Sequence, residues 1–175
     1  MDEALRHGVT VTCMVVSDGV ALPESLPAGV RRVCVPADVM ASISPHRTPQ
    51  GLLAVCELPD TAPPAALVPG RYVILDGVQD PGNVGTLLRS AAAFGFDGVL
   101  LSKGCAAPFP PKTPPASMGA AWRLPVAPVQ DLPPALQQLR ARGVAAPAAA
   151  PYHSPPLDAA PQDYPVGLCT LSSCE

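Results

Sequence analysis

The chain has 175 residues, of which 48% are hydrophobic, and it carries a formal net charge of −3. That length and apolar content suit one domain, or a small domain with part of a larger one, and the charge excludes a global basic field that would attract nucleic acid. The 25 prolines, many of them in Pro-Pro or Ala-Pro runs, restrict how much of the chain can form regular structure.

The six cysteines form no C-x-x-C pair, and no signal-peptide pattern opens the sequence. We therefore expect reduced thiols, no bound metal and a cytoplasmic protein. Zinc ligation is the less favoured alternative because the usual ligand spacing is missing. No apolar run reaches the roughly 18–20 residues that a membrane span requires.

The first 58 residues predict a small α/β module. Its expected elements are strands at 9–16, 31–35 and 52–56 and a short helix over 36–43 that opens near Asp38. The turn before the last strand contains His46 and Arg47, which are candidates for phosphate contact. The alternative is that both side chains only decorate an exposed turn. Residues 59–70 are rich in proline and predict a linker, so the second domain is expected to cover 71–175.

The stretch from Tyr72 to Leu101 predicts a βαβ unit with parallel strands. An apolar run at 72–75 suits a buried strand, a polar turn follows, and Asn83 is expected to cap a helix that ends at Gly95. Residues 99–101 predict the second strand, joined by a right-handed connection. Arg89 lies about two turns into this helix, away from its apolar stripe.

Asn83 and Arg89 follow the carboxyl end of a predicted parallel strand, where open α/β sheets bind ligands. They are therefore candidate site residues. The alternative is that Asn83 is only a helix cap and Arg89 only a solvated helix arginine.

The remaining segments alternate long loops with short elements. Residues 103–116 predict a proline-rich loop that contains Lys112, and Trp122 is expected to be a packing residue. Residues 131–143 predict a helix that Asp131 can cap and Gly143 ends. Strands are expected at 144–150 and from Tyr164 to Leu168.

The turn and helix DGVQDPGNVGTLLRSAAAFG, residues 76–95, resemble the first motif of the SpoU (TrmH-type) RNA ribose methyltransferases in the SPOUT superfamily. Further motifs agree in the same order, and they are Thr48–Gly51, Pro111–Lys112, Ala116–Ala120 and Arg123–Val126. In the family, the first of these ends an N-terminal module that contacts RNA.

The resemblance implies an α/β protein with a small N-terminal substrate-binding module and an incomplete SPOUT-type (trefoil-knot) parallel-sheet domain. It implies S-adenosylmethionine-dependent 2′-O-methylation of ribose in rRNA or tRNA, with homodimers expected for the family. Arg89 matches the arginine that stabilises the reacting ribose oxygen, and Asn83 matches the asparagine that shapes the site. Arg47 and Lys112 are the expected RNA contacts, each with a solvated surface cation as the alternative.

Two departures from the family pattern stand out. Pro114 and Pro115 occupy a run in which the family commonly has an arginine. After Leu168 the chain reads CTLSSCE, where the family continues into a glycine-asparagine-glutamate-glycine loop that contributes to the cofactor pocket. The resemblance therefore predicts a chain shortened before the knot, by a stop or a shifted reading frame, with its cofactor-binding residues unknown.

Two other functions compete with the methyltransferase. The first is a non-catalytic RNA-binding or partner-binding fragment, which binding of S-adenosylmethionine would distinguish from the enzyme. The second is a generic nucleotide-binding α/β protein, which is disfavoured because no G-x-G-x-x-G or P-loop pattern follows a strand.

Overall fold

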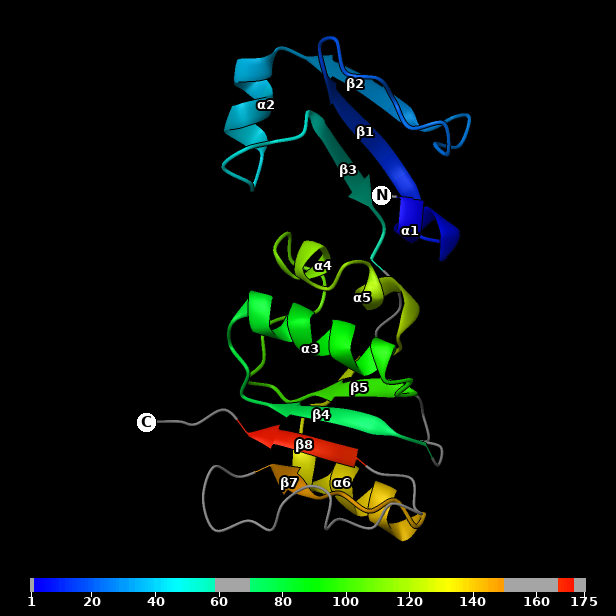
Figure 1. Ribbon diagram of the computed structural model, residues 1–175, viewed down its shortest axis with the longest axis vertical. Coiled ribbons are helices and arrows are strands. Elements are labelled where there is room, and N and C mark those ends of the chain that lie inside the picture. Colours follow the sequence, from blue (N-terminus) through cyan, green and yellow to red (C-terminus); the bar gives the residue numbers. More distant parts are fainter. Residues whose placement is uncertain (1, 59–69, 150–166, 172–175) are drawn as a thin grey trace. The chain divides into compact units, whose positions relative to one another are not determined.

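The computed structural model describes residues 2–58, 70–149 and 167–171 (Figure 1). The chain divides into two compact units, residues 1–59 and 60–175. In the described part, no helix is long and apolar enough to cross a membrane. The predicted linker lies almost wholly outside the described residues, as do residues 164–166 of the last predicted strand.

The first unit is a three-stranded sheet with two short helices. Its elements are α1 (Asp2–Arg6), β1 (Val11–Ser17), β2 (Arg31–Val35), α2 (Ala37–Ile43) and β3 (Leu52–Cys56). Central β1 pairs in parallel with β2 and antiparallel with β3. Met14 of β1 is fully buried and packs with Val11 and Leu26. The predicted strands are confirmed, whereas α1 was missed.

Helix α2 begins differently from the prediction. Pro36 occupies the N-cap position without a side-chain hydrogen bond, and Asp38 lies inside the first turn. The fixed φ of proline favours a helix start at this point, so the opening precedes the expected acidic cap.

The second unit is a five-stranded parallel sheet with helices on both faces (Figure 1). Its elements are β4 (Tyr72–Asp76), α3 (Pro81–Ala93), β5 (Gly98–Leu101), α4 (Thr113–Ala116), α5 (Ala120–Arg123), β6 (Val126–Pro128), α6 (Leu132–Ala141), β7 (Ala148–Ala149) and β8 (Gly167–Leu171). The strand order is β6-β5-β4-β8-β7. The last strand therefore enters between β4 and β7, and it continues to Leu171, three residues past Leu168.

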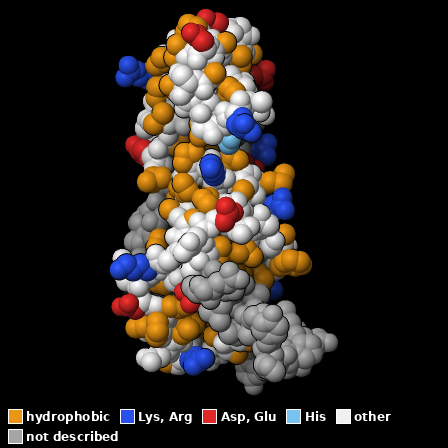
Figure 2. Space-filling view, turned by 90° about the vertical axis from the view of Figure 1, so that its left-hand side faces the viewer, with side chains coloured by type: hydrophobic (Ala, Val, Ile, Leu, Met, Phe, Trp, Pro, Cys, Tyr) orange, Lys and Arg blue, Asp and Glu red, His pale blue; other side chains and the backbone are white. Residues whose placement is uncertain are grey.

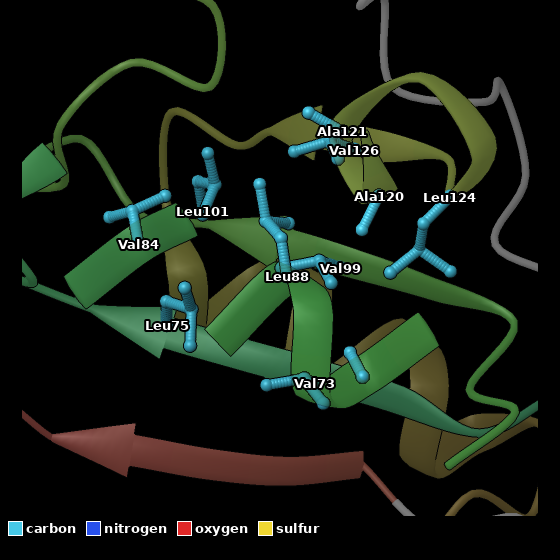
Figure 3. Packing of buried hydrophobic residues seen from close by; sticks show 11 residues of the cluster. Val73, Leu75, Val84, Leu88, Val99, Leu101, Ala120, Ala121, Leu124 and Val126 are labelled. Atoms are coloured by element: carbon cyan, nitrogen blue, oxygen red, sulfur yellow. The ribbon is translucent and has the colours of Figure 1, made fainter. Parts of the chain in front are cut away.

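Alternating side chains of the sheet supply two cores. Val73 and Leu75 of β4 face α3, where they pack with Val84 and Leu88, as Figure 3 shows. The intervening Ile74 lies in a second cluster on the other face, against α6. Burial on both faces explains why the predicted strand over 72–75 is a continuous apolar run.

Two expectations for the later part of the unit need correction. In the described part of the strand predicted over residues 144–150, Ala148–Ala149 form strand β7 and Ala145 forms a single bridge. Asp131 lies at the N-cap position of α6 but makes no side-chain capping bond. Gly143 follows α6 with a φ of 80°, which confirms the predicted stop.

Candidate functional site

Helix α3 is capped by Asp80 and not, as the sequence suggested, by Asn83. The Asp80 carboxylate accepts a hydrogen bond from the backbone N–H of Asn83 at 2.7 Å. Pro81 occupies the first helical position, where its missing N–H has no cost. The Asp-Pro pair was thus the overlooked signal, and Asn83 lies exposed in the first turn.

The loops that follow β4 and β5 are joined at the carboxyl edge of the sheet. Gly77 donates its N–H to Ser102 Oγ at 3.0 Å, and Val78 donates to Cys105 Sγ at 3.3 Å. The Cys105 thiol donates in turn to the Leu75 carbonyl at 3.1 Å, and Ala106 donates to the Val78 carbonyl at 2.8 Å. These hydrogen bonds between the two loops were not predicted, although polar residues after two neighbouring parallel strands were the available signal.

The hydrogen bonds between these two loops limit where a cofactor could bind. The backbone N–H groups of Gly77, Val78 and Ala106 donate within the protein and so do not point at a ligand. These three N–H groups are therefore not available to S-adenosylmethionine, which other groups would have to hold.

Gly85 allows α4 to lie directly on α3. A Cβ atom at Gly85 would come within 2.6 Å of Ala116 Cβ and 2.7 Å of the Thr113 carbonyl oxygen. Contacts this short do not occur between real atoms of these kinds, so only glycine fits. The side chains of Thr113 and Ser117 are fully buried beside it.

Both buried hydroxyls have hydrogen-bond partners. Thr113 donates to the Ala107 carbonyl at 3.2 Å, and Ser117 donates to the Pro114 carbonyl at 2.8 Å. Ser117 Oγ also accepts the N–H of Ala121 at 3.2 Å, which ties α4 to α5. The small-residue motif at 116–120 is thus a rigid turn between two short helices that lie against α3.

Arg89 projects from α3 toward this turn. Its Nη1 donates to the thioether sulfur of Met118 at 3.4 Å. Across the described residues, no carboxylate lies within 4.0 Å of its guanidinium, and the side chain is exposed. A guanidinium has five N–H donors and is always charged, so Arg89 presents positive charge and hydrogen-bond donors that the described residues leave uncompensated.

The two predicted catalytic residues share a helix but are not joined. Arg89 lies six positions after Asn83 (89 − 83 = 6), which is roughly 9 Å along the helix axis. Within the part that the structure describes, no hydrogen bond links their side chains. The site roles expected for Asn83 and Arg89 stay predictions.

The two predicted RNA contacts lie in different units. Arg47 is exposed in the turn at 45–48 of the first unit. Lys112 is exposed just before α4 in the second unit, with no side-chain capping bond. Trp122 stacks on Phe109 with their ring centroids 5.1 Å apart, so it packs as predicted. Among described residues there is no cluster of possible metal ligands, and Cys13, Cys34, Cys56 and Cys105 form no disulfide.

Comparison with known proteins gives consistent matches. The SpoU rRNA Methylase family pattern matches residues 70–170. The 23S rRNA (guanosine(2553)-2′-O)-methyltransferase RlmP of Bacillus subtilis is 35% identical over 145 residues, covering 82% of this chain and 56% of that protein. The human mitochondrial rRNA methyltransferase 3 is 39% identical over 111 residues, covering 60% and 26%. The chain thus spans about half the length, or less, of these relatives.

Solved structures share the fold. An rRNA methyltransferase from Sinorhizobium meliloti superposes with a TM-score of 0.81 at 27% identity, covering 97% of this chain and 66% of that one. An AdoMet-bound rRNA methyltransferase from the same organism gives a TM-score of 0.78 at 27% identity, covering 96% of this chain and 66% of that one. A TrmH-family protein from Porphyromonas gingivalis, described as a putative RNA methyltransferase, gives 0.75 at 34% identity.

Proposed function

Because the chain belongs to the SpoU rRNA methylase family, we propose that it acts in S-adenosylmethionine-dependent methylation of a ribose 2′-hydroxyl in ribosomal RNA. Support for ribosomal over transfer RNA comes from the relatives in Bacillus and human, both of which are named for rRNA. S-adenosylmethionine, when bound, supplies an electrophilic methyl group.

Arg89 carries the proposal. A ribose hydroxyl is a weak nucleophile at neutral pH, so its attack requires stabilisation of the negative charge that grows on the oxygen. The Arg89 guanidinium has a neutral thioether as its one partner among the described residues, and none of those residues neutralises its charge. It can therefore donate to the ribose oxygen or to a neighbouring phosphate of the RNA.

A role for Arg89 as the base that removes the proton is disfavoured. An arginine side chain stays protonated in proteins, and a group without a free lone pair cannot accept a proton. We therefore assign charge stabilisation to Arg89 and leave the proton to solvent or to the RNA itself. Asn83, exposed in the first turn of the same helix, is proposed to orient the ribose.

The first unit is proposed to bind the RNA substrate. Arg31 and Arg32 are exposed on β2, and Arg47 is exposed in the turn before β3. In the second unit, Lys112 is proposed to contact a phosphate. On the face shown in Figure 2, the Lys and Arg side chains of the described residues are scattered among hydrophobic and uncharged ones. Such isolated cations position RNA through single phosphates and not through a broad field.

Methyl transfer by Arg89 variants tests the proposal. The 175-residue chain is incubated with tritiated S-adenosylmethionine and 23S rRNA transcribed in vitro. We expect incorporation by the wild type and a loss of roughly 100-fold or more in Arg89→Ala, because one donor to a developing oxyanion is removed. Arg89→Lys keeps the charge and is expected to retain a measurable fraction. Thermal unfolding controls for the fold, since Arg89 is exposed.

Wild-type incorporation that persists in Arg89→Ala would contradict the assigned role. Tight RNA binding without any incorporation would favour the non-catalytic RNA-binding alternative. Calorimetric titration with S-adenosylmethionine separates the two cases further, because only the enzyme needs to bind it.

A further inference from the structure

Met118 has an unusual backbone conformation for its residue type. Its φ is 49°, and it is the one non-glycine residue with a positive φ among those the structure describes. The left-handed region favours glycine or asparagine, because a Cβ atom approaches the following carbonyl oxygen there. Gly119, with a φ of 83°, shows the residue type expected for such a turn.

Burial does not account for a long apolar side chain at this position. The Met118 side chain is 69% exposed, so its removal from water provides little compensation for the strained backbone. Strained non-glycine residues concentrate at functional sites, where a particular side chain is needed in a particular place. The question is therefore what the Met118 side chain contacts.

The contact is with Arg89. Nη1 of Arg89 donates to Met118 Sδ at 3.4 Å. A thioether is a neutral and weak acceptor, so it can orient the guanidinium without cancelling its charge, as a carboxylate would. The remaining guanidinium donors are left for a ligand.

The position of the sulfur is set by the packing below it. Met118 directly follows the buried Ser117, and its N–H donates to the Pro115 carbonyl at 3.1 Å. The α4 backbone lies against Gly85, one turn before Arg89 on the same helix. Helix α3 thus contains both Arg89 and Gly85, the residue against which α4 packs.

We propose that Met118 is a positioning residue that holds the Arg89 guanidinium in the orientation required for methyl transfer. Its importance for activity rests on the function proposed above for Arg89. The contact itself does not, and this allows the two to be tested separately.

The contact is tested by NMR on the 17.9 kDa chain, through the rate of rotation of the Arg89 guanidinium about its Nε–Cζ bond. Arg89→Lys identifies the signal by its disappearance. In Met118→Leu the side-chain shape is nearly kept and the sulfur is lost, so we expect rotation to become about five-fold faster, as for loss of one weak hydrogen bond. Phe94→Leu is the matched control, because Phe94 is 74% exposed at the C-cap of the same helix and its substitution is expected to leave rotation unchanged.

The contribution to activity is tested by a double-mutant cycle in the methyl-transfer assay. Met118→Leu should lower kcat a few-fold in the wild-type background and have no further effect in Arg89→Lys, because residues that act through one contact are not additive. A merely structural role would lower kcat equally in both backgrounds. Met118→Gly separates the roles again, because relief of the positive φ should raise Tm while kcat falls.

The outcomes are distinct. Equal guanidinium rotation in wild type and Met118→Leu overturns the proposal, whether or not the chain transfers methyl groups. Equal losses of kcat in both backgrounds also overturn it. If rotation changes as expected but the wild type transfers no methyl group, the contact between Met118 and Arg89 is supported and the proposed function fails.

Discussion

Two adjacent residues, Asp80 and Pro81, determine where helix α3 begins. Asp80 accepts the N–H of Asn83, and Pro81 supplies a preset φ at the first helical position. Because Asp80 caps the helix, the Asn83 side chain has no capping role. An exposed amide in the first turn is then available to a ligand.

The cap makes a prediction that distinguishes the two residues. Asp80→Ala removes the acceptor for an end-of-helix N–H and is expected to lower the free energy of unfolding by about 1 kcal/mol. Asn83→Ala keeps that bond, because the backbone N–H donates, and should leave stability nearly unchanged. Urea unfolding of both variants measures the difference. Equal losses in the two variants would contradict the assignment of the cap.

At the scale of single residues, part of the candidate site could be predicted from the sequence. Arg89 could be proposed as a site residue from the sequence, because its motif and spacing are visible in the residues. Met118 could not, because its role depends on a backbone φ and on a contact across 29 positions that no local pattern encodes. The cap was misassigned because Asp and Asn are both good caps, and only the following proline distinguishes them.

At the scale of the elements, the close contact between α3 and α4 is the feature that builds the site. It depends on Gly85, whose missing side chain admits Ala116 and the Thr113 carbonyl oxygen. The contact orders the turn that carries Met118. A four-residue helix such as α4 has little stability of its own, so packing must hold it.

Gly85→Ala tests this contact, because the expected change in the free energy of unfolding is opposite in sign to that of the same substitution in an exposed helix. An alanine in an exposed helix interior would stabilise α3 by up to about 1 kcal/mol relative to glycine. Here the new Cβ would meet backbone atoms of α4, so we expect a loss of about 1–3 kcal/mol instead, measured by urea unfolding.

Ala116→Gly in the Gly85→Ala background provides the control. It removes the nearest clashing atom but leaves the Thr113 carbonyl oxygen in place, so stability should return only in part. A stabilising effect of Gly85→Ala alone would show that α4 does not lie on α3 in solution.

Ionisation of Tyr72, at the start of β4, is expected to lower the stability of the protein at alkaline pH. Burial raises the pKa of its phenol, the Asp97 carboxylate raises it further, and Arg142 lowers it. Because the pKa of Tyr72 is higher in the folded protein than in the unfolded chain, the stability that this residue contributes is fully present below the unfolded pKa. That contribution is lost as pH rises through the folded pKa. We expect Tm to fall more steeply above about pH 10 in wild type than in Tyr72→Phe. Parallel Tm profiles of the two proteins would contradict this.

The elements themselves were predictable in proportion to their length and regularity. Helix α3 has a clear apolar stripe and strand β4 is a continuous apolar run, so both were predicted, β4 within one residue and α3 with its cap displaced from Asp80 to Asn83. Helices α4 and α5 span four residues each, which is too short for a helical period to appear. Strand β7 is short as well, and its pairing partner β8 comes 18 positions later in sequence (167 − 149 = 18).

At the scale of the whole molecule, RNA binding must work against an acidic chain. With a net charge of −3, affinity is expected to come from a few local cations that neutralise individual phosphates. Arg47 and Lys112 are the proposed examples, one in each unit.

Salt dependence of RNA binding tests these two residues. Arg47→Ala and Lys112→Ala should each weaken binding and reduce the slope of log K against log salt by roughly one, as for loss of one phosphate contact. Arg140→Ala is the control, because this exposed residue lies on α6, which packs on the sheet face opposite α3. Slopes that are identical in all three variants would remove Arg47 and Lys112 from the interface.

The central claim is that the chain directs a methyl group to a ribose oxygen through Arg89. The most direct measurement is mass spectrometry of nucleosides from 23S rRNA after incubation with the chain and S-adenosylmethionine. The account predicts a 2′-O-methylated nucleoside with wild-type protein and its absence with Arg89→Ala. A methyl group found on a base, or a 2′-O-methylated nucleoside that persists with Arg89→Ala, would contradict it.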